Sequence, residues 1–429
     1  MEKLAFNSLL IYLFMLLSRP MEYVPFLNPY RIILLTAILS IALFFLSGSV
    51  NKIFNSSPPN NETYWITILT LWIFITMPFS RWIGGSLNTF YSYYLNSLLL
   101  FFLIAYIVDS EERLKKIITV SLIAFSIIII VSAYNKMFQF DASQDYGRLG
   151  GIGATLSSSN LLAFVIVLMF PLYFYSLFVE QKRIKRYLLL GITITAIFDF
   201  IATVSRGGFL GFMTMGAILM NDLSKLKRKG LVFLLITAVY IGSFFVSDMF
   251  IERMSTIFTK PQETAYSATS QAIGSTRARE GLLEVGIKMI ELNPLFGVGM
   301  GNFKLGNREI TGATGPKQVS HVTYIDYAAE MGIPALIIYL LLLFSVLLGI
   351  QKTIKDIKDH SENKKILEML YISLALRNSL ISYIIMSAFI SIGYDFYLFF
   401  LIGLIAALRK IVTKELMDIQ QDQSKCVVA

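Results

Sequence analysis

Apolar residues in this chain gather in long runs that are separated by short polar segments. A transmembrane helix needs about 20 mostly apolar residues to cross the hydrocarbon core of a bilayer. The runs therefore predict an all-α integral membrane protein with about twelve transmembrane helices. Several runs are shorter than a straight span, so we expect some helix ends to be displaced. The predicted helices cover residues 4–18, 31–47, 64–80, 87–108, 117–136, 160–178, 187–204, 207–221, 230–249, 321–350, 369–390 and 394–410.

The composition indicates the same class of protein. Of the 429 residues, 55% are hydrophobic and 15% are charged, and the mean hydropathy is +0.66. A fold surrounded by water cannot bury that much apolar surface. The single cysteine, Cys426, excludes an internal disulfide, and no Cys/His spacing suggests a metal site, so we expect neither a metal nor a cofactor.

The positive charge is interpreted as a topology signal. The net charge is +9, but the basic residues stand in short clusters between apolar runs, which argues against a nucleic-acid surface. Lysine and arginine accumulate in short loops on the cytoplasmic side. The clusters lie at residues 182–186, 225–229, 352–365 and 409–414. An even number of predicted spans separates each cluster from the next, so all of them fit the cytoplasmic side. Both termini are then expected inside, and residues 137–159, 205–206, 250–320 and 391–393 outside.

Residues 250–320 are much longer than an ordinary connection, and such loops are usually functional or disordered. We treat residues 1–429 as a single polytopic membrane domain, with this extracytoplasmic loop inserted between transmembrane spans. Within it, residues 277–292 repeat apolar side chains at helical spacing. Asn293-Pro294 ends that helix, because the residue before proline avoids the α region. The glycines of the following GVGMGNF segment either pack closely or let backbone N–H groups approach a phosphate; packing is favoured, because no strand precedes them.

Among the arginines of the predicted outer segments, four are candidates for a binding role: Arg148, Arg206, Arg277 and Arg279. The positive-inside bias argues against cations on that side unless they have a use. The economical interpretation is an anionic ligand outside the membrane. For any single arginine, snorkelling to lipid headgroups is the alternative. Arg277 and Arg279 point about 200° apart on a regular helix, so both cannot bind one ligand unless the turn is frayed.

His321 begins the helix that re-enters the membrane after the outer loop. It is the only side chain in the outer segments with an unperturbed pKa near neutrality, so it is the natural general base. Asp326 is off its helix face, and a carboxylate that orients the imidazole would have to come from elsewhere. The alternative is a histidine that caps a helix at the membrane interface.

Four motifs carry a family resemblance: GRLGG with Asn160 behind it, SRGG at a span boundary, an Arg-led helix ending in NPLFGVGMGNF, and His321-Val322-Thr323-Tyr324 leading to Glu330-Met331-Gly332. Their order over about residues 148–335 resembles the O-antigen ligase and polymerase superfamily of bacterial membranes. The resemblance implies an all-helical glycosyltransferase of the bacterial inner membrane, with its active site facing the periplasm or the cell exterior. It also implies an undecaprenyl-pyrophosphate-linked glycan as donor, a glycan or glycolipid as acceptor, and no metal.

The resemblance further implies residue roles. His321 would deprotonate the acceptor hydroxyl. In the loop helix, counting back from NPLFG favours Arg279, but Leu283 stands where relatives often carry tryptophan, so the neighbouring Arg277 stays a candidate. The expected ligands of the donor pyrophosphate are therefore Arg206, Arg279, Arg277 and, as a pyrophosphate or sugar contact, Arg148.

Arginine suits such a reaction, because its planar guanidinium binds two phosphate oxygens at once and stabilises charge on a departing phosphate without magnesium. Direct attack by a base-activated hydroxyl predicts inversion at the anomeric carbon without a covalent intermediate. The charged residues inside predicted spans include Asp199 and Arg377. Because intramembrane charges normally need partners, we expect these two to pair; a contact between Arg377 and the donor is the alternative.

The acceptor stays open at this stage. We favour a ligase that moves a finished glycan onto the lipid A core of lipopolysaccharide. A polymerase of polysaccharide repeat units and a protein glycosyltransferase need the same donor site. A polytopic transporter or flippase for an anionic substrate would also explain the spans and the arginines. It would not explain a long outer loop with its own amphipathic helix, and no repeat between the halves is evident, which transporters often show.

Overall fold

A computed structural model describes residues 1–49, 51, 61–138, 148–151, 158–225, 251, 254, 268–312, 319–359 and 364–428. Every regular element within these ranges is helical, as predicted. The predicted span at 230–249 lies outside the described residues. The elements are α1 (Glu2–Ser18), η1 (Pro20–Glu22), η2 (Pro25–Tyr30), α2 (Ile32–Leu46), α4 (Asn61–Thr76), η3 (Met77–Phe79), α5 (Ile83–Thr89), η4 (Phe90–Tyr94), α6 (Leu95–Ile107), α7 (Glu111–Phe138), α9 (Ser159–Val179), α10 (Arg183–Thr203), α11 (Arg206–Lys225), α14 (Ala268–Leu292), α15 (Phe303–Thr311), α16 (Thr323–Lys358), α17 (Lys364–Met386) and α18 (Phe396–Val428).

Within these ranges, nine helical segments are long and apolar enough to cross a membrane, which makes the chain a multi-pass membrane protein. Each of them coincides with a predicted run. Two further runs form helices outside this group: α2, which is apolar but shorter than a full span, and α11. The long segments are Glu2–Glu22, Asn61–Phe79, Ile83–Ile107, Glu111–Phe138, Ser159–Val179, Arg183–Thr203, Thr323–Lys358, Lys365–Met386 and Phe396–Gln421.

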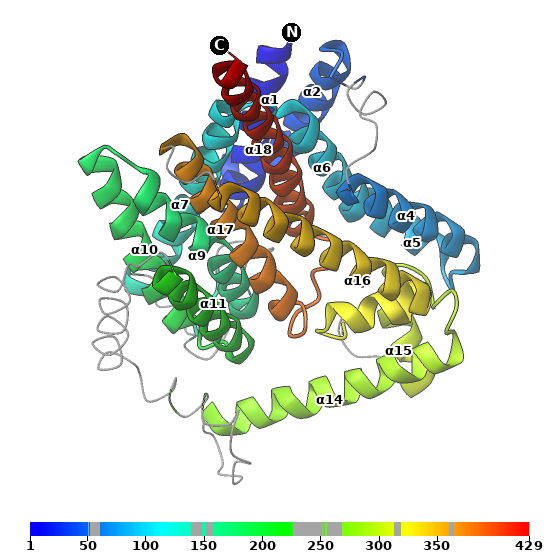
Figure 1. The fold of residues 1–429 in the computed structure, drawn as a ribbon. Helices are drawn as coiled ribbons and strands as arrows, with labels where there is room; N and C mark the ends of the chain where they lie inside the picture. Colours follow the sequence, from blue (N-terminus) through cyan, green and yellow to red (C-terminus); the bar gives the residue numbers. More distant parts are fainter. Residues whose placement is uncertain are drawn as a thin grey trace.

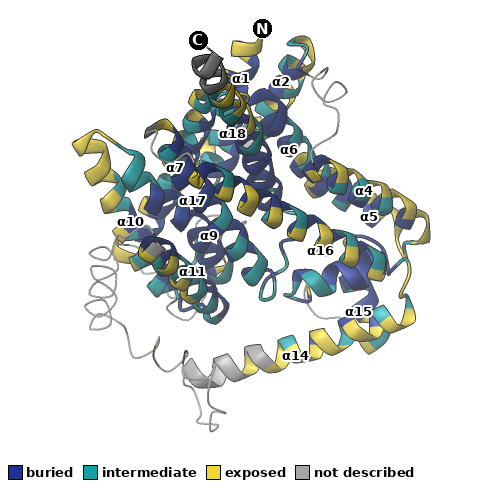
Figure 2. Ribbon diagram, in the orientation of Figure 1, coloured by how far each residue is buried: buried dark blue, intermediate teal, exposed yellow. Residues whose placement is uncertain are grey.

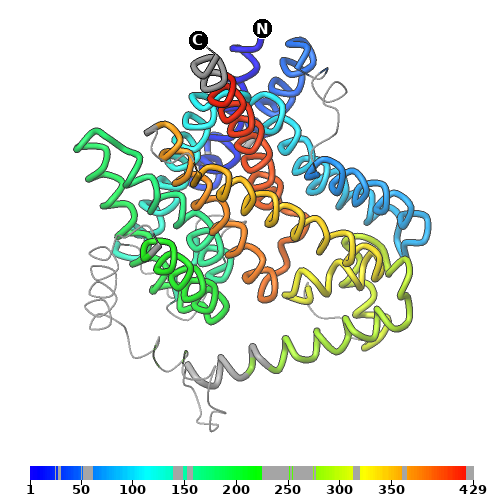
Figure 3. Tube along the Cα trace, viewed as in Figure 1, coloured from blue at the N-terminus to red at the C-terminus, as the bar shows by residue number. Residues whose placement is uncertain are grey.

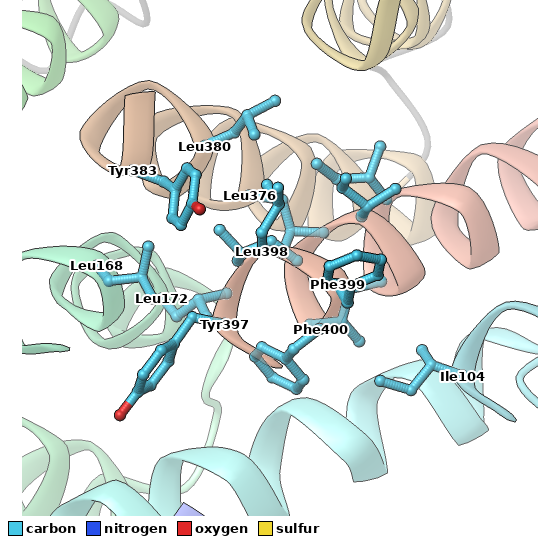
Figure 4. Packing of buried hydrophobic residues seen from close by; sticks show 14 of the residues in the cluster. Ile104, Leu168, Leu172, Leu376, Leu380, Tyr383, Tyr397, Leu398, Phe399 and Phe400 are labelled. Carbon is cyan, nitrogen blue, oxygen red and sulfur yellow. The ribbon is translucent and has the colours of Figure 1, made fainter. Parts of the chain in front are cut away.

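The centre of the bundle is formed by α9, α17 and α18 (Figure 2). In their apolar windows 78%, 78% and 83% of the residues are buried, against 28% in α10, which therefore lies at the periphery. Aromatic rings join the three central helices: the ring centroid of Phe164 lies 6.0 Å from that of Tyr383 and 5.3 Å from that of Tyr397. Figure 4 shows Leu172 of α9 near Tyr397 and Leu376 of α17 near Leu398. Close packing of this kind holds helices together where lipid removes the hydrophobic driving force.

The predicted pairing of Asp199 with Arg377 is wrong. Arg377 of α17 binds Asp222 of α11 instead, with Nη2 2.5 Å from Oδ2. The same carboxylate accepts a hydrogen bond from Tyr175 of α9 at 2.9 Å and one from Asn378 at 3.1 Å. Helix packing explains the difference: α11 packs on α17, whereas α10, which carries Asp199, packs on α7 and α9. Asp199 is fully buried, and its carboxylate forms no hydrogen bond with any described residue.

A second layer covers one end of the bundle. Helix α14 runs beneath it and joins α15 and the start of α16, while both termini lie at the opposite end (Figures 1 and 3). A small apolar core of its own holds this layer together, formed by Leu282, Met289, Val298, Phe303 and Ala329. The predicted loop helix is thus present; it begins at Ala268 rather than Arg277 and ends at Leu292, before Asn293-Pro294 as predicted.

Candidate active site

The glycine segment 297–303 closes on Glu330 of α16. The N–H of Gly301 donates to the Glu330 carboxylate at 2.7 Å, and the N–H of Phe303 donates to it at 3.0 Å. The hydroxyl of Tyr394 adds a third hydrogen bond at 2.6 Å. The N–H of Gly299 donates to the Glu330 carbonyl oxygen at 2.8 Å. These groups are engaged by the chain itself, so the interpretation of the segment as a packing turn is confirmed over direct phosphate contact.

Gly332 lets the same layer dock tightly. Its φ of +84° breaks the helical course of α16, and a Cβ there would lie 2.0 Å from the carbonyl oxygen of Leu295. A side chain at this position would be strained and would also clash. One residue later, the N–H of Ile333 donates to the carbonyl of Pro294 at 2.8 Å. The Glu330-Met331-Gly332 motif therefore fixes the C-terminal end of α14 against α16.

His321 stands just before α16 in a left-handed conformation, with φ of +59°. This region is uncommon for residues other than glycine, and such strain persists only where the surroundings enforce it. Hydrogen bonds hold the chain on both sides of His321. The Ser320 hydroxyl donates to Asp326 at 2.6 Å and accepts the N–H of Val322 at 2.9 Å. The N–H of Thr323 donates to the carbonyl of Ser387 at 2.8 Å, which ties the turn to the end of α17.

Arg148 holds three helix ends together. Its Nε donates to the carbonyl of Thr203 at the end of α10 at 3.0 Å, and its Nη2 donates to the side-chain oxygen of Asn160 in α9 at 3.2 Å. The hydroxyl of Ser205, which precedes α11, donates to the same amide oxygen at 2.9 Å. The GRLGG and SRGG motifs and Asn160 thus form one junction. Asn160 carries no charge, so the sequence reading gave it no role of its own; a polar side chain at the head of an apolar run was the available signal.

Arg206 opens α11 beside this junction and is half-buried. The chain reverses sharply before it, because Val204 adopts a left-handed φ of +49° at the end of α10. A Cβ at the next residue, Gly207, would lie 2.7 Å from the Cβ of Phe389, so only glycine lets α11 approach this closely. The SRGG motif therefore places the guanidinium of Arg206 at a tight corner of the bundle.

The two loop arginines differ in burial. On α14, Arg279 lies at helical spacing from the buried residues Leu282 and Met289 and is half-buried, whereas Arg277 is exposed. Burial lowers the pKa of Arg279 below its usual value, and the nearby positive charges of Arg206 and Arg148 lower it further. The structure thus brings Arg148, Arg206 and Arg279 within range of each other's charge; Arg277 lies on the outer face of the helix.

The imidazole belongs to the same group. Burial lowers the pKa of His321, and the positive charge of Arg279 lowers it further. A histidine with a lowered pKa is neutral near pH 7, which leaves a ring nitrogen able to accept a proton. The constellation consists of three guanidinium groups and one neutral base at the end of the bundle that α14 covers.

These features define the class: a multi-pass, all-helical membrane protein that gathers arginines and a neutral histidine at one end of its bundle. Residues 191–340 match the family model of O-antigen ligase, which confirms the resemblance to the O-antigen ligase and polymerase superfamily. The match covers this part of the chain only, over which the protein is similar to O-antigen ligases. The matched range holds Arg206, Arg279 and His321, and Arg148 precedes it. No curated protein matches the chain.

Proposed function

We propose that the protein is a metal-independent, inverting glycosyltransferase of the bacterial inner membrane. It transfers a glycan from an undecaprenyl-pyrophosphate donor to an acceptor hydroxyl on the periplasmic or outer face. The observation that carries the proposal is the group of Arg148, Arg206 and Arg279 beside a neutral His321. The charges of described residues that lower the pKa of Arg279 are the positive charges of Arg206 and Arg148, which favours a ligand with several negative charges, such as a pyrophosphate.

In this mechanism the acceptor hydroxyl attacks the anomeric carbon of the donor sugar, and its proton passes to the imidazole of His321. The bond between the anomeric carbon and the pyrophosphate oxygen breaks, and the electron pair leaves with the pyrophosphate. Arg206 and Arg279 stabilise the charge that develops on this leaving group. Arg148 already donates to Thr203 and Asn160, so its first role is to hold the junction, and its charge adds to the field around the pyrophosphate. A single displacement inverts the anomeric configuration.

The general-base role requires an unprotonated imidazole. Positive charge and burial both favour the neutral form of His321, so the arrangement that binds the anion also keeps the base ready in the free enzyme. A bound pyrophosphate would offset part of the arginine charge and make proton acceptance easier. Donor binding and base strength are therefore coupled through Arg279.

For the acceptor we favour a ligase that joins a finished glycan to the lipid A core of lipopolysaccharide, in line with the description of the matched family model. A polymerase of repeat units is the alternative within the superfamily, since it needs the same donor site. A transporter or flippase for an anionic substrate is the alternative from another class. It would move its substrate without breaking the glycosyl bond.

One assay distinguishes these functions. Purified protein is incubated in EDTA with an undecaprenyl-pyrophosphate-linked oligosaccharide and either lipid A core or a second copy of the donor lipid. Release of undecaprenyl pyrophosphate with glycan on the core supports the ligase, and longer lipid-linked chains support the polymerase. The His321→Ala variant should form neither product, while Arg308→Ala, which alters an exposed residue of α15, should retain activity. Uptake into proteoliposomes without any transfer would contradict the proposal.

A further inference from the structure

A cavity of about 540 Å³ lies between α7, α9, α10 and α17, at the opposite end of α9 and α10 from the arginines. Apolar side chains provide most of its walls, among them Leu122, Leu172, Leu189, Ile192 and Ile372. None of the residues that line it belongs to the candidate active site. The volume falls within the range of ligand sites of about 300–1,000 Å³. The walls of the cavity therefore suit an apolar occupant, and they lie away from the residues proposed to bind the donor pyrophosphate.

The cavity opens towards lipid. Two of its lining residues, Leu188 of α10 and Ile123 of α7, have 65% and 52% of their surface exposed. Both belong to helices that are long and apolar enough to span the membrane, so their exposed side chains face hydrocarbon. Because α10 is the least buried of the nine long helices and shares the exposed wall of the cavity with α7, we place the lateral entrance on this side. A lipid chain can enter there directly from the bilayer.

The rim of the cavity is cationic. The charges of the lining residues sum to zero, because the two cations Lys115 and Lys185 are matched by the two carboxylates Glu180 and Glu368. Lys115 also forms an ion pair with Glu111 at 2.5 Å. Beyond the lining, the start of α10 adds Lys182, Arg183 and Arg186, all exposed. The surplus charge at the rim is positive. Basic pockets between transmembrane helices suit anionic lipid headgroups, to which each cation near the surface contributes favourably.

We propose that this cavity binds an acyl chain of one anionic phospholipid, whose headgroup rests on the cations of segment 182–186. The apolar walls receive the chain, and the basic rim selects the charge of the headgroup. A free anion would not fill the apolar interior, and an uncharged hydrocarbon would not bind the cations of the rim. The site is separate from the proposed donor site, which lies at the other end of α9 and α10.

The experiment uses the full-length protein in nanodiscs that contain equal parts of phosphatidylglycerol and phosphatidylcholine, with retained lipid counted by native mass spectrometry. Wild-type protein should retain phosphatidylglycerol in preference to phosphatidylcholine. The triple variant Arg183→Gln/Lys185→Gln/Arg186→Gln should retain at least about ten-fold less of it. The matched control, Lys352→Gln/Lys355→Gln/Lys358→Gln, removes the same charge from exposed positions of α16 and should stay within about two-fold of wild type.

A second variant tests the cavity apart from the charge. Ser176→Trp fills the cavity from α9 and leaves every cation in place, and Ile192→Trp does the same from α10. Each variant that elutes and melts like wild type should lose phosphatidylglycerol by about five-fold or more. Unchanged retention would show adsorption to surface cations and overturn the proposal. Equal retention of both lipids, or equal loss in the α16 control, would overturn it as well.

A photoreactive residue in place of Leu188 should capture phospholipid, and capture of this chain instead would also contradict the site.

Discussion

Buried arginines occur in two settings in this protein. Within the bundle, Arg377 is paired with Asp222, and Arg409 of α18 is paired with Glu62 of α4. At the end covered by α14, the charges of described residues that lower the pKa of Arg279 are the positive charges of Arg206 and Arg148. The first setting neutralises the cation and joins helices. The second collects positive charge in a partly buried place, which is what a site for an anionic ligand requires.

The energetic consequence differs between the two settings. A partly buried cation such as Arg279 that lies near other positive charges loses hydration that it does not fully regain, which lowers stability. A protein tolerates such a cost where the residue serves function, and removal of the residue then raises stability. Paired arginines behave in the opposite way, because removal of one partner leaves the other charge buried. Stability and activity should therefore respond in opposite directions in the two settings.

The largest expected effect on stability is that of Arg377→Met. It leaves the buried carboxylate of Asp222 with only Tyr175 and Asn378 as hydrogen-bond partners. We expect the free energy of unfolding to fall by about 3–5 kcal/mol. Arg279→Met should leave it unchanged or raise it. Unfolding of both variants in one detergent measures the difference, and Arg377→Met/Asp222→Leu should recover most of the loss. A similar destabilisation by Arg279→Met would remove the distinction between the settings.

The largest expected effect on activity is that of His321→Ala. Loss of a positioned general base lowers the rate of the chemical step by about 10²–10⁴-fold. The change should leave donor binding and thermal stability close to wild type, because the imidazole is only partly buried and the turn is held by hydrogen bonds of Ser320 and Thr323. Single-turnover transfer with a fluorescent lipid-linked donor gives the rate. His360→Ala, which lies outside the described residues, serves as the histidine control. Transfer at more than a tenth of the wild-type rate would argue against a base at this position.

The two loop arginines give a matched pair of variants. Arg279→Gln should reduce kcat/KM for the donor by about 10–100-fold, since a hydrogen bond to a charged group is worth about 1.5–3 kcal/mol. Arg277→Gln, on the exposed face of the same helix, should change it less than about two-fold. Both variants remove one positive charge from α14, so long-range effects of net charge cancel in the comparison. Equal losses would mean that burial on α14 does not identify the donor contact.

Much of the helical arrangement follows from the sequence alone. The spans are set by runs of apolar residues, and the end of α14 is set by Asn293-Pro294, which are local properties. The start of α14 was not predicted correctly, because residues 268–276 are polar and small and show no apolar period. The choice between Arg279 and Arg277 was open for a related reason. The choice between the two arginines depends on which face of α14 packs on α16. The burial of Leu282 and Met289, which the sequence does not show, identifies that face.

Partners across helices could not be predicted. Arg377 was assigned to Asp199 because both are intramembrane charges, but the order in which helices pack decides that Asp222 is its neighbour. The role of Glu330 was likewise hidden, because its hydrogen bonds come from a glycine turn and from Tyr394, both remote in sequence. In contrast, the gathering of arginines and histidine at one end was foreseen from topology. That prediction rested on arginines in segments expected outside the membrane, an argument that needs no knowledge of packing.

The smallest expected effect, and the sharpest test of the coupling within the site, concerns pH. Transfer requires neutral His321, so the rate falls as the pH drops through the pKa of this group and is constant above it. Because burial and Arg279 both lower that pKa, the acid limb should lie below the ordinary histidine value of about 6.5. Arg279→Gln removes one of the two causes and should therefore move the limb to higher pH. The pH profile of kcat/KM, which reports the free enzyme, shows this shift separately from weaker donor binding. Arg277→Gln should leave the limb in place. An unmoved limb in Arg279→Gln would mean that Arg279 does not tune the imidazole, even if it binds the donor.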